Sequence, residues 1–105
     1  MEITRLHHAQ ITVGREQTEA ARAFYLDALG FREIPKPDSL VKRGGFWFAI
    51  GEQQVHIGVE DGVDRTATKA HLAYEVRGLA EWRGLLEARG IETSGNEPIP
   101  GYDRI

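Results

Sequence analysis

Three of the four histidines occupy positions that suit metal binding. His8, His56 and His71 each lie in a run of alternating apolar and polar residues, and each falls on the polar side of its run. Such alternation is typical of a half-buried strand, so the three imidazoles should line one concave face of a sheet. Neutral imidazole is the commonest protein ligand for first-row divalent ions. The sequence therefore predicts a metal site from His8, His71 and His56, although a single strand histidine is more often merely solvated. His7 falls on the apolar side and is interpreted as a residue at the strand edge.

Other residues could complete a small-molecule site around this metal. Glu60 and Glu75 are the candidate carboxylates for general acid–base catalysis. Gln10 is a candidate for substrate binding, and Trp47 and Tyr102 are aromatic candidates for the lining of a pocket. Each has a simpler interpretation, which is core packing for Trp47 and ordinary solvated polarity for the strand residues Gln10, Glu60 and Glu75.

The first half of the chain predicts the elements that must position these residues. Alternation predicts a strand at residues 6–13, and apolar residues at helical spacing predict a helix at 18–29 that Gly30 ends. A short strand at 31–34 precedes a proline-containing loop. Two strands at 46–50 and 54–60, separated by a turn, predict a hairpin.

The second half repeats the beginning of this pattern. A strand is predicted at residues 70–76, a helix at 79–89 ended by Gly90, and a short strand at 91–93. Each half therefore reads as strand, helix, glycine and strand, which indicates an internal duplication. We expect one domain over residues 1–105, with module one at 1–62 and a truncated module two at 63–105.

Composition excludes several classes of function. The net charge is −3 and basic residues are scattered, which argues against nucleic-acid binding. The sequence has no cysteine, so thiol catalysis, disulfides and cysteine-type zinc sites are excluded. No apolar stretch approaches the roughly 18 residues of a membrane span, and the N-terminus lacks the apolar core of a signal peptide. By default we expect a cytoplasmic protein with no membrane or nucleic-acid partner.

The local motifs resemble one known family. They are HAQITV at residues 8–13, ARAFYLDALGF at 21–31, GFWFAIG at 45–51, QVHIGVE at 54–60 and KAHLAYEV at 69–76. This series is similar to the vicinal oxygen chelate superfamily, also called the glyoxalase/bleomycin-resistance/dioxygenase superfamily. The resemblance covers nearly the whole chain and specifies the fold better than the reaction.

The resemblance implies an α+β fold of paired βαβββ modules, with a mixed, curved sheet, helices outside and the second module truncated. It also implies a divalent metal ion (Zn, Ni, Mn or Fe) that is chelated by vicinal oxygens of the substrate. By position His8 and His71 correspond to the ligands on the first strands, and His56 lies on the last strand of module one. The family's closing glutamate strand would begin at or just after Tyr102, so that ligand has no counterpart here. An incomplete sheet would leave an exposed edge, which a homodimer could cover.

Three functions remain open. The first is a metal-dependent lyase, isomerase or dioxygenase that acts on a small molecule with vicinal oxygens. The second is a metal-free protein that binds, and thereby sequesters, a small molecule or antibiotic in an aromatic-lined pocket. The third is a chain whose function was lost with the missing strands.

Overall fold

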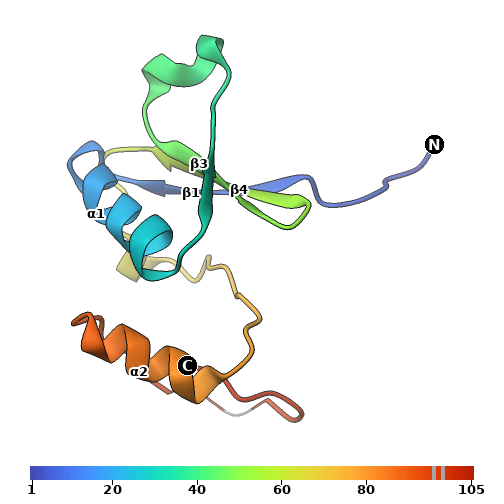
Figure 1. Cartoon of the computed structure of the whole chain (residues 1–105). Helices are drawn as coiled ribbons and strands as arrows, with labels where there is room; N and C mark the ends of the chain where they lie inside the picture. Colours follow the sequence, from blue (N-terminus) through green and yellow to red (C-terminus); the bar gives the residue numbers. More distant parts are fainter. Residues whose placement is uncertain (96, 98) are drawn as a thin grey trace. The chain divides into compact units, whose positions relative to one another are not determined.

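The chain forms two compact units, Met1–Thr68 and Lys69–Ile105 (Figure 1). The computed structural model describes residues 1–95, 97 and 99–105. The two units are defined by contacts, whereas the modules predicted above are defined by an internal repeat. The duplication and its boundary at residues 62 and 63 therefore stay predictions.

The first unit is built on one mixed sheet of four strands in the order β1-β4-β3-β2. The strands are β1 (His8–Val13), β2 (Arg32–Ile34), β3 (Phe46–Ile50) and β4 (Gln53–Val59). β1 runs parallel to β4, whereas β3 is antiparallel to both β2 and β4. This arrangement confirms the predicted mixed sheet and matches one βαβββ module. The hairpin register follows from the two-residue turn at Gly51 and Glu52, because Ile50 pairs with Gln53.

A helical segment covers one face of this sheet (Figure 1). It consists of α1 (Thr18–Arg22) and a wider π-helical turn, η2 (Ala23–Ala28), in place of the single regular helix that was predicted. The core is aromatic: the ring of Phe48 is fully buried and stacks on Tyr25 and Phe31 at centroid distances of 5.3 and 4.7 Å. Gly30 follows the helix with φ +76°, which confirms its predicted role as the cap.

The connections of the first unit contain three short 3-10 helices, η1 (Arg15–Gln17), η3 (Asp38–Arg43) and η4 (Arg65–Ala67). After η3 the chain returns to the sheet through Gly45. A Cβ atom on Gly45 would lie 1.9 Å from the carbonyl oxygen of Ile57, and its φ is +78°. Only glycine fits this approach. The packing of β3 against β4 therefore depends on this residue.

In its described residues the second unit contains one helix, α2 (Leu79–Ala88), close to the predicted range. The predictions of strands at residues 70–76 and 91–93 are wrong, because neither segment is a strand in the structure. Within the described residues of this unit, β pairing is limited to an isolated bridge between Ile99 and Tyr102. Alternation specifies which side chains share a face, but a strand also needs a partner for its backbone groups.

None of the helices in the described residues is long and apolar enough to cross a membrane.

Candidate functional site

The face of the sheet opposite the core carries most of the candidate residues of the first unit. In the register of the sheet, Gln10 and Trp47 are both paired with His56, and His8 is paired with Gln54. Paired residues point to the same side of a sheet. Strand pairing therefore places His8 and His56 on one face of the sheet, as was predicted for these two histidines, and Gln10 and Trp47 lie on the same face.

Three rings form a continuous stack across β3, β4 and β1. The rings of Trp47 and His56 lie 3.6 Å apart between centroids and are nearly parallel, at 1°. The rings of His56 and His8 follow at 4.1 Å and 13°. His56 is only 5% exposed, although it lies on the face away from the core. Its two neighbours cover both sides of its ring, so His56 is a buried member of the stack, whereas His8 is exposed at its end.

The environment of His56 keeps its imidazole neutral. Burial, as the largest cause, and the nearby His8, His7 and Lys36 together lower the pKa of His56 from 6.5 to about 4. The Nε2 atom of His56 lies 2.9 Å from the Oε1 atom of Gln54. Because an amide oxygen only accepts, Nε2 carries the hydrogen and donates it. The lone pair of this ring is therefore on Nδ1.

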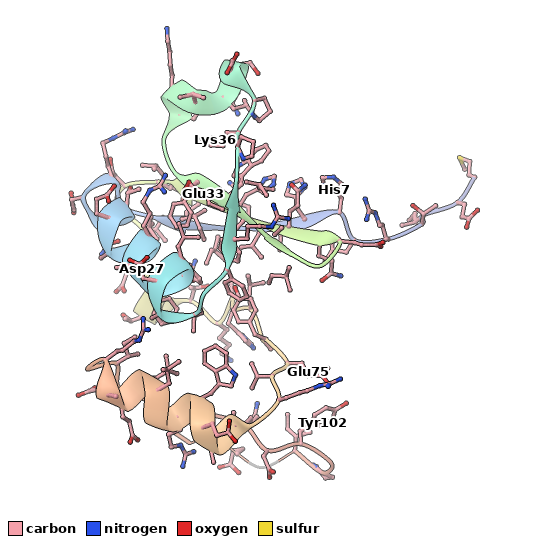
Figure 2. All side chains as sticks on the ribbon, viewed as in Figure 1. His7, Asp27, Glu33, Lys36, Glu75 and Tyr102 are labelled. Atoms are coloured by element: carbon pink, nitrogen blue, oxygen red, sulfur yellow. The ribbon has the colours of Figure 1, made fainter. Side chains whose placement is uncertain are left out.

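His7 is a part of the site that the sequence pattern did not identify. Its Nδ1 atom lies 3.0 Å from Nδ1 of His8, and the two rings meet edge to face at 5.2 Å. Figure 2 shows His7 where the N-terminal segment enters β1. His7 precedes the strand, so strict alternation does not apply to it, and its side chain reaches its neighbour. Two consecutive histidines at the start of a strand are the signal that could have indicated this pair.

His71 lies in the second unit and is exposed. Its Nδ1 atom lies 2.8 Å from the carbonyl oxygen of Lys69, to which it must donate. The lone pair of His71 is therefore on Nε2. In the described part of the chain, no three His, Cys, Asp or Glu side chains gather closely enough to hold a metal ion. Thus no predicted set of three histidine ligands is assembled within either unit.

The remaining predicted site residues belong to both units. Gln10 lies over Gly58, where an added Cβ would meet its Nε2 atom at 2.9 Å. Glu60 is exposed directly after β4, and its backbone N–H donates to the carbonyl oxygen of Val13. Glu75 and Tyr102 both belong to the second unit, are exposed and are labelled in Figure 2. The structure thus places Gln10 on the same face as the stack of Trp47, His56 and His8 through strand pairing.

An open groove of about 380 Å³ is lined by none of the three residues of the stack. Arg22, Glu33, Lys36 and Phe46 are among its lining residues. The Nη1 atom of Arg22 donates to both carboxylate oxygens of Glu33 at 2.7 and 2.8 Å, and its guanidinium lies 4.8 Å from the centre of the Phe46 ring. Lys36 donates to the carbonyl oxygen of Gly44. Both cationic side chains that line the groove, Arg22 and Lys36, therefore have partners within the protein. None of the predicted site residues lines it.

Comparisons with known proteins identify the family of this chain. Residues 5–98 match the model of the Glyoxalase/Bleomycin resistance protein/Dioxygenase superfamily. This chain therefore belongs to that superfamily, as its motifs suggested. No curated protein sequence gives a significant match.

Solved structures give the same assignment. A glyoxalase family protein from Bacillus anthracis is 40% identical, with a TM-score of 0.85, and the match covers 95% of this chain and 81% of that one. The E126Q mutant of the fosfomycin resistance protein FosX from Listeria monocytogenes, complexed with Mn(II) and 1S,2S-dihydroxypropylphosphonic acid, is 21% identical, with a TM-score of 0.67 and coverage of 93% and 74%. A bleomycin resistance determinant encoded on the transposon Tn5 is 16% identical, with a TM-score of 0.58 and coverage of 90% and 72%. The last two matches show the fold alone.

Proposed function

We propose that this protein is a divalent-metal-dependent enzyme that acts on a small molecule with vicinal oxygens, as a lyase, isomerase or dioxygenase. The supporting observation is shared by His8 and His71. Each is exposed, and in each the Nδ1 atom is engaged in a hydrogen bond, at 3.0 and 2.8 Å. Histidines that bind a metal commonly hold their second ring nitrogen in this way, which orients the ring and fixes the tautomer.

The chemistry of these donors fits a first-row divalent ion, since imidazole suits Zn, Ni, Cu and Fe and Mn(II) accepts it with oxygen ligands. The ligands that we propose are Nε2 of His8 and Nε2 of His71. When bound, the ion would act as a Lewis acid toward the vicinal oxygens of the substrate. The structure of FosX, a protein of the same fold, holds both Mn(II) and a dihydroxyphosphonate.

Protein groups would supply the remaining functions. Glu60 and Glu75 are the proposed carboxylates that accept a proton from the substrate. The amide of Gln10 would hydrogen-bond the substrate, and the rings of Trp47 and Tyr102 would contact its apolar part. A homodimer is also proposed, because β1 is an outer strand in the described sheet and a partner would cover its edge.

Metal titration of the purified protein tests this proposal. Isothermal titration with Mn(II), Ni(II) and Zn(II) should show one site per chain in the wild-type protein. His8→Ala and His71→Ala should each weaken binding at least about tenfold, and the double variant should abolish it. Gln53→Ala, an exposed position on β4, is the control and should bind as the wild type does.

Two results would contradict the proposal. One is the absence of stoichiometric binding for every metal. The other is equal affinity in the wild-type protein and the double variant. Thermal stabilisation by planar cationic compounds, with no response to metals, would instead support a metal-free binding protein.

A further inference from the structure

The stack restricts which histidine of the first unit can bind a metal. An imidazole nitrogen binds a metal through a lone pair that lies in the plane of its ring. The rings of His8 and His56 are almost parallel, at 13°, with centroids 4.1 Å apart. Their lone pairs therefore lie in two parallel planes and do not converge on an ion between the rings. In this arrangement only one of the two residues can be a ligand.

Two contacts exclude Nε2 of His56 from that role. It donates its hydrogen to Oε1 of Gln54 at 2.9 Å, so it has no lone pair to offer. The lone pair of His56 is on Nδ1, but the ring lies 3.6 Å from the Trp47 ring at an angle of 1° and only 5% of the residue is exposed, so an ion has little access to that atom. Rotation of the ring toward an ion would break both the stack and the hydrogen bond. His8 is exposed and has no such restriction on its Nε2 atom.

His7 determines which nitrogen of His8 is available. A hydrogen bond between two Nδ1 atoms 3.0 Å apart requires that one of them carries the hydrogen. If His7 donates, then Nε2 of a neutral His8 is protonated and cannot bind a metal. If His8 donates to His7, its lone pair is on Nε2. A metal on Nε2 of His8 is therefore compatible only with His7 as the acceptor.

We propose that His56 and His7 are positioning residues of His8, not metal ligands: His56 and Trp47 form a fixed aromatic support for the His8 ring, and His7 holds its tautomer. This inference rests on the proposed metal-dependent function, with His8 as the ligand of the first unit. It reassigns His56 from a ligand to a support and gives His7 a role. Such outer contacts typically change metal affinity by 10–100-fold.

Histidine-selective NMR of the full chain tests the assignment directly. Long-range proton–nitrogen spectra of ¹⁵N-histidine-labelled protein distinguish the two tautomers and a metal-bound nitrogen for each ring. On titration with Zn(II), Nε2 of His8 should shift as a bound nitrogen while its Nδ1 stays protonated. The nitrogens of His7 and His56 should keep the signatures of unbound nitrogens. A metal-bound signature on His56 or His7 would overturn the proposal and leave the metal site intact, whereas no change at any histidine would contradict the proposed function itself.

Paired substitutions provide a second readout that does not depend on activity. His56→Phe keeps a flat ring in the stack but has no nitrogen, and His56→Ala removes the ring. We expect Zn(II) affinity to stay within about threefold in His56→Phe and to fall at least about tenfold in His56→Ala. Equal losses in both variants would show that the nitrogen of His56 matters and would overturn the stacking role. For His7, the acceptor amide of His7→Gln should retain more affinity than His7→Phe, and the reverse order would contradict its role as an acceptor.

Discussion

The two units begin from similar sequence patterns and form different structures. In Met1–Thr68, alternating segments pair into a sheet around the buried rings of Phe46 and Phe48. In Lys69–Ile105, the alternating residues 70–76 form no strand, and none of the described residues of α2 is buried. The same alternation thus yields a strand only where a hairpin supplies hydrogen-bonding partners and aromatic residues supply a core. Both units nevertheless present an exposed histidine with its Nδ1 atom engaged, His8 and His71.

The largest effect should come from the glycine that permits close packing in the first unit. In Gly45→Ala, the Cβ would lie 1.9 Å from a backbone oxygen at a φ of +78°, so we expect a loss of more than about 4 kcal/mol in the free energy of unfolding. Gly90→Ala is the matched change in the second unit. Gly90 has φ +74° but nothing within 4 Å, so the loss should be only about 1–2 kcal/mol.

Urea unfolding with one tryptophan per unit measures both changes. Trp82→Phe leaves Trp47 as the probe of the first unit, and Trp47→Phe leaves Trp82 as the probe of the second. Similar losses for Gly45→Ala and Gly90→Ala would contradict the difference in packing described here.

A smaller effect should appear as acid sensitivity of the first unit. Because burial and the nearby His8, His7 and Lys36 lower the pKa of His56 from 6.5 to about 4, the unfolded chain binds a proton in this range and the folded chain does not. Stability is then complete above pH 6.5 and falls as the pH decreases toward 4, by at most about 3 kcal/mol for this shift. His56→Phe should remove this component. Urea unfolding at several pH values, followed by Trp47 fluorescence, gives the comparison. If the pH dependence of stability were the same in His56→Phe as in the wild-type protein, His56 would not be its origin.

The smallest effect should come from the ion pair of Arg22 and Glu33. Both side chains are partly exposed, so water screens the pair, and Glu33→Gln should lower stability by less than about 1 kcal/mol. In this variant the guanidinium of Arg22 should keep its contact with the Phe46 ring. Glu87→Gln, at an exposed position on α2, is the control and should lie within about 0.5 kcal/mol of the wild type. A loss above about 2 kcal/mol for Glu33→Gln would mean that the pair supports the core.

Much of the first unit could be predicted from local pattern. The bounds of β3 at Phe46–Ile50 agree with the prediction, since a double glycine precedes an aromatic run and a turn follows it. The pairing of Trp47 with His56 follows from the two-residue turn at Gly51 and Glu52, because hairpin length sets the register. The predicted turn also included Gln53, so this register was not predicted. The π-helical turn at Ala23–Ala28 was not predictable, since an apolar stripe looks the same in both kinds of helix. The burial of His56 was not predicted. Alternation indicates on which face of the sheet a side chain lies, but not which other rings stack on that side chain.

The site was predicted less completely than the fold. Alternation assigned His7 to the apolar side, although it lies before β1 and contacts His8. The predicted strand that was to carry His71 and Glu75 is not formed, so pattern alone could not give their surroundings. Side-chain hydrogen bonds, such as that of His71 to Lys69, depend on local backbone geometry that no periodicity reports.

The measurement that tests the central claim most directly is broadening of amide NMR signals by substoichiometric Mn(II). If His8 and His71 bind the ion, broadening should be strongest around these two residues and should disappear in the double variant His8→Ala, His71→Ala. The account predicts both results. Broadening confined to exposed carboxylates such as Glu52, and unchanged in the double variant, would contradict it.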